Sequence, residues 1–156
     1  MIKVSLLFAS HLLALLIGFV AGIYALPILT APSAPSANDI AISSESAVYT
    51  AEFRRDLEGS DLLHWGEGSV SVGRGAIAFA GQMSPGPDYK LYLTREFVET
   101  EEDFLKLKDS SVRLGDVKTF ESFIVSVPEQ VEISEFNSVV VWCESFSQFI
   151  TAAQYR

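Results

Sequence analysis

A long uninterrupted apolar stretch at the N-terminus constrains this chain more than any other feature. Residues 4–29 read VSLLFASHLLALLIGFVAGIYALPIL and contain no Asp, Glu, Lys or Arg. With a rise of about 1.5 Å per residue, a helix of this length is ample to cross a hydrocarbon core of about 30 Å. The alternative is a cleaved signal peptide, whose apolar region usually covers only about 7–15 residues. The stretch therefore predicts a single transmembrane helix that attaches the chain to a membrane.

The basic residues around this helix predict its orientation. Lys3 precedes the span, and the next basic residue after it is Arg54. The positive-inside rule then keeps residues 1–3 in the cytoplasm and exports the remainder of the chain. In a Gram-negative bacterium this describes a single-pass protein of the inner membrane with a periplasmic domain.

The residues after the helix divide into a linker and a folded domain. Residues 30–46 begin with TAPSAPSAN, a Pro/Ala/Ser composition that favours an extended spacer, and residues 47–156 form the exported domain. Within that domain, residues 95–108 carry acidic residues early and lysines late, which favours a short helix at the domain edge. Short apolar or alternating runs bounded by turn residues predict strands at 69–73, 76–81, 89–93, 120–128, 138–142 and 149–155. The predicted fold class is mainly β, a β-sandwich or barrel-like domain.

Composition and motifs exclude several classes of function. The net charge is −9 and the basic residues are scattered, so the clustered positive surface that a nucleic-acid partner requires is absent. The sequence has no nucleophile elbow, phosphate loop or zinc-protease helix, and independent catalytic turnover is therefore unsupported. No motif for a nucleotide or a flavin occurs. Two histidines are too few for a multi-histidine metal site within one chain, while a heme or a single metal ion stays open as a cofactor.

Cys143 is the only cysteine and the leading candidate for function. It lies in VVVWCESF, so no intramolecular disulfide can form and the apolar run predicts a buried strand. Burial would raise the pKa of the thiol and hide it, which makes Cys143 a core residue in one interpretation. In the other interpretation an exported, unpaired thiol is retained for use, as a sulfenate, a mixed disulfide with a partner, or a ligand of a metal or heme.

Polar and aromatic residues near Cys143 in sequence or in other turn segments are candidate binding residues. His64 lies in LLHWGEG beside glycines that permit close backbone approach, and with Cys143 it could activate the thiol or hold one metal ion. Asp88 lies in a GPD turn, where it is expected to accept backbone hydrogen bonds. Glu144 follows the thiol and points to the opposite face of a strand. The candidate binding residues are His64, Trp65, Asp88, Trp142 and Glu144.

Four segments in order resemble the DM-thirteen domain family, called electron-transfer DM-thirteen, and in particular its small bacterial membrane-anchored members. They are DLLHWGEGSVSV, SPGPDYKLYL, VKTFESFIVSVP and NSVVVWCESFSQFITAAQYR, and the resemblance covers roughly residues 47–156. It implies a redox role centred on the cysteine that matches Cys143. The expected function is an accessory redox, electron-transfer or ligand-binding role, with an envelope protein or redox protein as partner. The alternative is a non-catalytic structural or protein-interaction module with Cys143 as a core residue.

Overall fold

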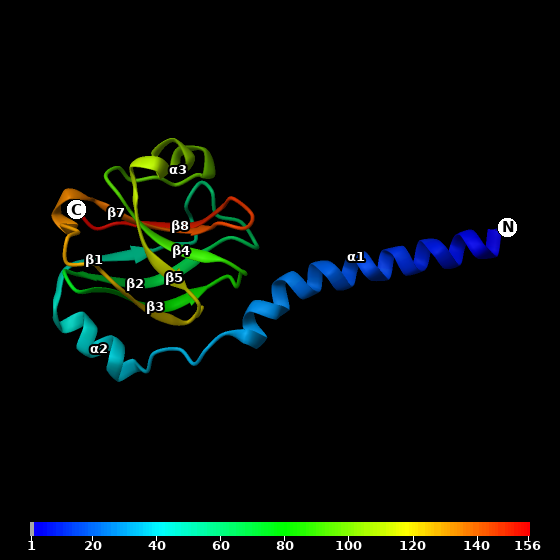
Figure 1. Cartoon of the computed structure of the whole chain (residues 1–156), viewed down its shortest axis with the longest axis horizontal. Coiled ribbons are helices and arrows are strands. Elements are labelled where there is room, and N and C mark those ends of the chain that lie inside the picture. Colours follow the sequence, from blue (N-terminus) through cyan, green and yellow to red (C-terminus); the bar gives the residue numbers. More distant parts are fainter. Residues whose placement is uncertain (1) are drawn as a thin grey trace.

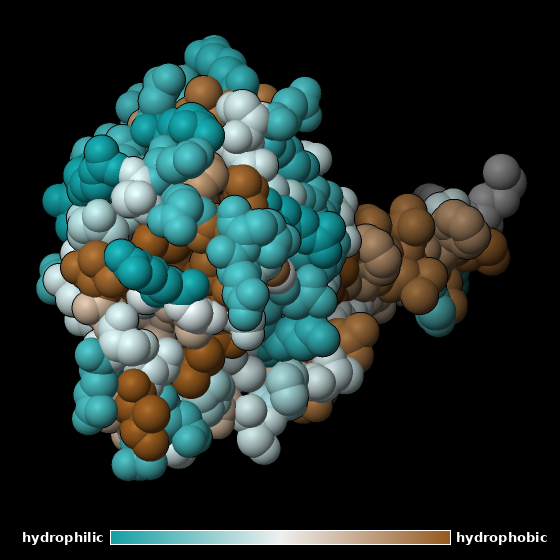
Figure 2. Space-filling view, turned by 60° about the vertical axis from the view of Figure 1, so that its left-hand side comes forward, coloured by the Kyte–Doolittle hydropathy of each residue, from teal (hydrophilic) through white to brown (hydrophobic). Residues whose placement is uncertain are grey.

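The N-terminal helix projects from one end of a β domain. The computed structural model describes residues 2–156, and helix α1 runs from Ile2 to Thr30 (Figure 1). The stretch from Lys3 to Thr30 is long and apolar enough to cross a membrane, and none of its most apolar part is buried inside the molecule. In Figure 2 the visible part of the helix is predominantly brown, whereas the visible face of the domain is largely teal and white.

A second helix lies within the segment predicted as a linker. Helix α2 covers Ala37–Glu45 and begins with a capping box, in which the Ser36 hydroxyl accepts from the Asp39 amide and the Asp39 carboxylate accepts from the Ser36 amide. The helix lies against strands of one sheet, and the Ser122 hydroxyl donates to the Pro35 carbonyl at 3.0 Å. Residues 31–36 of the expected spacer TAPSAPSAN (30–38) are neither helix nor strand, whereas the capping box and the packing surface stabilise a helix over residues 37–45 that was not predicted.

Within the described residues 2–156, eight strands form two antiparallel sheets of four strands each, which confirms the predicted sandwich. One sheet has the order β1-β2-β3-β6 and the other the order β5-β4-β7-β8. The first consists of β1 (Ala47–Phe53), β2 (Gly66–Gly73), β3 (Ala76–Met83) and β6 (Ser122–Ser126). The second consists of β5 (Val112–Val117), β4 (Tyr89–Thr94), β7 (Ser138–Cys143) and β8 (Gln148–Gln154). Strands β1 and β5 were not predicted.

The central strands of the second sheet, β4 and β7, are buried on both faces. The inner face of this sheet packs against the first sheet, and its outer face is covered by helix α3 (Glu101–Leu107), which is followed by short 3-10 helices at Lys108–Ser110 and Ile133–Glu135. Along β7, Val139, Val141 and Cys143 enter the core between the sheets, while Val140 and Trp142 enter the cluster under α3. This double burial explains why residues 139–142 are uniformly apolar rather than alternating.

Because three tyrosines are buried, we expect high pH to destabilise the domain. Burial raises the pKa values of Tyr89, Tyr92 and Tyr155 above their ordinary value of 10.0. Above about pH 10 an unfolded chain releases phenolic protons that the folded chain retains, so the unfolded state binds fewer protons and the free energy of unfolding falls with rising pH. We expect this contribution to be constant below that pH and to decline above it. Urea unfolding of the full chain at a series of alkaline pH values measures the slope, and a flat profile would contradict the prediction.

Candidate functional site: a cavity at Cys143

Cys143 ends strand β7 at the side of the domain from which α1 projects. Its backbone pairs with Tyr89 of β4 on one side and Gln148 of β8 on the other. Only 2% of the residue is exposed, and it belongs to the core between the two sheets. The prediction of a buried strand position is confirmed. Such burial prevents the cysteine of a second protein from reaching the sulfur, and this disfavours a mixed disulfide with a large partner.

The surroundings of the thiol favour its protonated form. Burial raises the pKa of Cys143 above its ordinary value, while backbone N–H groups of Phe146 and Asp88 act in the opposite direction with smaller effect. The thiol is therefore protonated at neutral pH and is a poor nucleophile, because nucleophilic attack requires the thiolate. A protonated thiol can still contact a neighbouring ligand or donate a hydrogen bond to it.

A cavity of about 370 Å³ lies against Cys143, and His64 lines the same cavity. The sequence could not show that these two residues, which lie far apart in the chain, belong to one site. A volume of this size falls in the range of about 300–1,000 Å³ that is usual for small-molecule sites. Most of the lining is apolar, so the thiol and the imidazole are among its few polar groups. The lining residues are Val20, Ala21, Ile23, Tyr24, Leu63, His64, Pro85, Gly86, Pro87, Tyr89, Cys143, Phe146, Gln148 and Ile150.

Asp61 fixes the position of the His64 side chain. One Asp61 carboxylate oxygen accepts the backbone N–H groups of Leu63 and His64, at 2.7 and 2.8 Å, which shapes the loop. The other oxygen lies 3.0 Å from Nδ1 of His64. Since this contact engages Nδ1, Nε2 is the ring nitrogen left for a ligand, and the carboxylate favours the tautomer with its proton on Nδ1.

Trp142 and Glu144 lie on the opposite face of the sheet from the thiol. Trp142 is fully buried under α3, where its ring centroid is 4.8 Å from that of Phe104. The Glu144 carboxylate accepts hydrogen bonds from the Tyr92 hydroxyl and from Lys108, the latter at 2.5 Å. Burial raises the pKa of Glu144, and these two donors outweigh it, so that the pKa is lowered overall. Neither residue lines the Cys143 cavity.

Asp88 connects the start of β4 with the β7–β8 turn, and we call its contacts the Asp88 clamp. Its carboxylate lies 2.6 Å from Lys90 Nζ and accepts a hydrogen bond from the Ser145 hydroxyl at 3.0 Å, while its backbone carbonyl accepts from the Glu144 amide. Both oxygens thus serve contacts outside its own turn, contrary to the expectation of backbone hydrogen bonds within that turn. The clamp holds the start of β4 against the β7–β8 turn and thereby supports the wall of the cavity.

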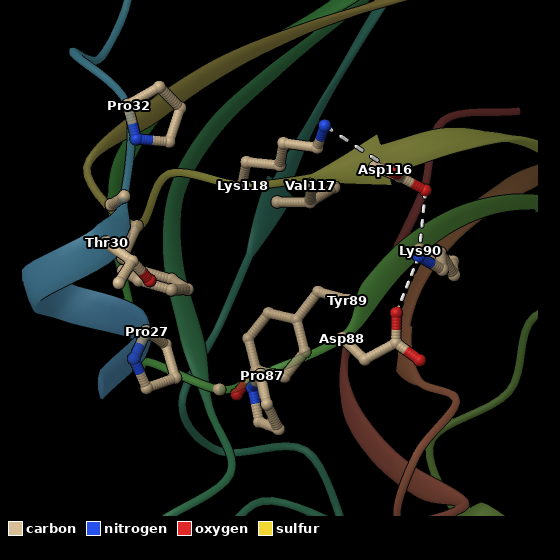
Figure 3. A pocket seen from close by; sticks show the side chains of 13 residues that line it. Pro27, Thr30, Pro32, Pro87, Asp88, Tyr89, Lys90, Asp116, Val117 and Lys118 are labelled. Atoms are coloured by element: carbon tan, nitrogen blue, oxygen red, sulfur yellow. Dashed lines mark hydrogen bonds and ion pairs between the residues drawn. The ribbon is translucent and has the colours of Figure 1, made fainter. Parts of the chain in front are cut away.

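A smaller polar cavity of about 240 Å³ adjoins this clamp (Figure 3). It lies between the end of α1, at Pro27 and Thr30, and the ion pairs of the second sheet. Lys90 lies between Asp88 and Asp116, with 2.8 Å to the latter, as the dashed lines in Figure 3 show. The hydrogen bond from Lys90 is the largest influence on the pKa of each of these carboxyl groups and lowers both. The charges compensate one another, so this cavity offers no free charge to a ligand.

Trp65 belongs to a different surface from Cys143. The guanidinium of Arg55 lies 3.3 Å from the centroid of the Trp65 ring. The backbone N–H and C=O groups of Trp65 are hydrogen-bonded to Ser84. Trp65 lines a separate hollow with Ile28 and Met83. Of the predicted binding residues, the structure therefore brings only His64 to the cavity at Cys143.

Several residues of the cavity were not singled out from the sequence. Four come from α1 (Val20, Ala21, Ile23, Tyr24), and nothing in an apolar span indicates that part of it borders a domain. Leu63 and Phe146 were also missed. Phe146 carries a weak signal, because it is a large apolar residue among the polar residues of the β7–β8 turn.

A comparison with known protein families gives a match over most of the chain. A model of the family described as Electron transfer DM13 matches residues 34–155. No curated protein matches, and no solved structure matches. Among the described residues 2–156, no group of three or more His, Cys, Asp or Glu side chains is placed to hold a metal ion. Cys143 and His64 therefore have no third such ligand beside them among these residues.

Proposed function

Since the chain belongs to the Electron transfer DM13 family, we propose that it is a membrane-tethered accessory electron-transfer domain whose redox-active ligand binds in the cavity at Cys143. The observation that carries the proposal is that Cys143 and His64 line one largely apolar cavity of small-molecule size. The protonated thiol and Nε2 of His64 supply two polar contacts, and the apolar walls exclude water from the ligand. The chain contributes binding and orientation, while the ligand carries the electrons.

Thiol reagents of two sizes test whether the cavity gives access to Cys143. We expect a small methanethiosulfonate, applied at mildly alkaline pH so that part of the thiol is ionised, to transfer its methylthio group to Cys143 in the folded full chain, because a small reagent fits in the cavity. A bulky maleimide should react only after unfolding, because only 2% of Cys143 is exposed. Intact-protein mass spectrometry measures both reactions, and Cys143→Ser is the negative control. Equal resistance to both reagents in the folded protein would overturn the proposed ligand site.

The bound ligand itself can be sought in the purified protein. We expect Cys143→Ala to weaken binding of a redox-active ligand, seen in the absorption spectrum or by mass spectrometry of an extract, and to leave the unfolding curve close to that of the parent. Trp142→Phe is the matched control, because Trp142 adjoins Cys143 in sequence but lies on the other face of the sheet. Loss of ligand in both variants to the same extent would contradict a site at Cys143.

The alternative function is a structural or protein-interaction module of the cell envelope. It is favoured by exposed apolar residues at the end of the domain, among them Leu62 and Phe146. It also predicts no cavity at the thiol, whereas a cavity is present there. A stable envelope partner that is retained equally by the parent chain and by Cys143→Ser would support this alternative over the electron-transfer proposal.

The proposed location is the inner membrane of a bacterial cell, with residues 1–3 inside and the domain from residue 47 onward in the periplasm. The placement of Lys3 before the helix and of Arg54 well after it supports this orientation. Protease added to spheroplasts should digest the domain or a C-terminal tag, whereas protease added to intact cells should not. Protection of the tag in spheroplasts would contradict the proposed orientation and indicate the opposite one.

A further inference from the structure

One wall of the Cys143 cavity is the apolar helix itself. Val20, Ala21, Ile23 and Tyr24 of α1 face Pro85–Pro87, Cys143 and Phe146 of the domain across the cavity. The cavity is therefore bounded on one side by a helix that is long and apolar enough to cross a membrane. Its position relative to the bilayer follows from the position of these residues along the helix.

The length of the span places the cavity at the outer boundary of the hydrocarbon region. About 20 helical residues cross the hydrocarbon core. Counted from Val4, the first residue of the apolar stretch, the crossing ends near Ile23, and Tyr24 then lies at the interface, where tyrosine is enriched. Because Val20 and Tyr24 both line the cavity, its mouth lies at the level where acyl chains meet headgroups.

The domain presents apolar side chains at this same end. Leu62 is 93% exposed, Leu63 is 57% exposed and Phe146 is 56% exposed. Figure 1 shows that the segment before β2 and the β7–β8 turn, which carry these residues, lie at the end of the domain from which α1 projects. We call Leu62, Leu63 and Phe146 the apolar rim. Leu63 and Phe146 also line the cavity, so the rim borders its mouth.

The rim is held outward by a fixed loop. Asp61 accepts the backbone N–H groups of Leu63 and His64, and the Asp61 amide donates to the His64 carbonyl at 3.0 Å. The same contacts that place His64 at the cavity thus present Leu62 to the outside. Large apolar side chains held out in this way are typical of membrane or protein contacts. The adjacent membrane helix identifies the lipid surface as the occupant.

We propose that the apolar rim enters the outer leaflet interface and that the cavity is filled from the membrane, with a lipid-soluble quinone as its ligand. This inference rests on the proposed electron-transfer function. A quinone with an isoprenoid tail dissolves in the lipid phase, carries electrons there and has two oxygens that accept hydrogen bonds. The cavity suits such a head, since its walls are apolar while the Cys143 thiol and the His64 imidazole offer polar contacts. The tail leaves through the mouth between α1 and the rim into the bilayer.

A fluorophore on the rim tests contact with the membrane. In full-length Cys143→Ser, a polarity-sensitive label is attached to Leu62→Cys, or to Leu105→Cys as a control on α3, where Leu105 is 48% exposed. In phosphatidylcholine vesicles we expect a blue-shifted emission that shallow lipid-borne quenchers reduce at position 62 and leave unchanged at position 105. Emission characteristic of water at both positions would overturn the membrane contact.

A photoreactive quinone tests loading from the lipid. An azido-ubiquinone with an isoprenoid tail is dissolved in vesicles that contain the full chain, and the labelled peptides are mapped by mass spectrometry. We expect labels in the segments around His64, Pro87 and Cys143, which line the cavity, and competition by unlabelled long-tailed ubiquinone. Leu62→Ser should reduce the labelling about tenfold, because the variant forfeits the burial of a leucine in the interface. Leu105→Ser should leave it unchanged.

Leu62 separates the two proposals, because it belongs to the rim but does not line the cavity. Duroquinone, a quinone without a tail, serves as the water-accessible competitor for the chain in detergent micelles. If duroquinone competes for the cavity while Leu62→Ser labels normally in vesicles, the ligand site stands and loading from the membrane is wrong. If no quinone labels the cavity in vesicles or in micelles, the proposal that the ligand is a quinone is wrong. The reaction of Cys143 with the two thiol reagents then tests the ligand site independently.

Discussion

Replacing Gly68 with alanine is expected to lower the free energy of unfolding by about 3 kcal/mol or more, through backbone strain and overpacking together. Gly68 has a φ of +138°, a conformation that residues with a Cβ rarely adopt. A Cβ there would also lie 2.4 Å from the carbonyl oxygen of Ala80 and 2.5 Å from the Cα of Gly81, which is its partner on β3. Two backbones approach closely here, and neither can move without disturbing the β2–β3 ladder.

Urea unfolding of the full chain in detergent, followed by circular dichroism, measures this loss. Gly75→Ala is the matched control, because among the described residues no heavy atom beyond Gly75 and its two chain neighbours lies within 4 Å of the added methyl group, and Gly75 has no positive φ. We expect the control to change the free energy of unfolding by less than about 0.5 kcal/mol. Equal unfolding midpoints for the two variants would contradict the described approach of β2 and β3.

Replacing Trp142 with alanine is expected to cost about 3–5 kcal/mol, the range for removal of a large aromatic side chain from a core. Trp142 is fully buried between the sheet and α3, in contact with Phe104, and Lys108 Nζ lies 5.3 Å from its ring centroid. Its Nε1 has no hydrogen-bond partner among the residues described. Trp142→Phe should therefore cost less than Trp142→Ala, because it keeps a ring and breaks no hydrogen bond.

The same unfolding measurement provides the check for Trp142. Leu105→Ala, on the exposed side of α3, should stay within about 0.5 kcal/mol of the parent. Trp142→Phe should also retain the reaction of Cys143 with the small thiol reagent, because its ring lies on the other face of the sheet. A Trp142→Ala variant as stable as the parent would show that α3 does not seal this face.

Strands with strong local signals could be predicted, and strands with weak ones could not. Residues 138–142 and 89–93 were expected as strands from their apolar runs and turn boundaries, and both are strands. Strand β5 reads VRLGDV, in which a glycine, an arginine and an aspartate dilute the apolar pattern. It forms because β4 offers it a partner along one edge, and that contact is a tertiary one. The helix at 37–45 was likewise hidden by the Pro/Ala/Ser composition before it.

The residues of the candidate site could also be predicted only in part from the sequence. Cys143 stood out because it is the only cysteine and follows a buried run, and His64 stood out because of its glycine-rich surroundings. Asp88 was a candidate because of its GPD turn, and Trp142 and Glu144 because they flank the thiol in sequence. Because side chains alternate along β7, Trp142 and Glu144 lie on the face of the sheet opposite the thiol. The Asp88 carboxylate forms an ion pair with Lys90. Of the five predicted binding residues, only His64 reaches the cavity.

By itself the sequence determined the apolar helix, the β class of the domain and the buried position of the thiol, since each depends on hydropathy and residue types within a short window. The tertiary structure alone decided that His64 and Cys143 line one cavity and that α1 forms a wall of it. Those contacts join residues from separate strands, loops and the N-terminal helix. They depend on how two sheets and a helix pack, which is a property of the whole fold that no local pattern contains.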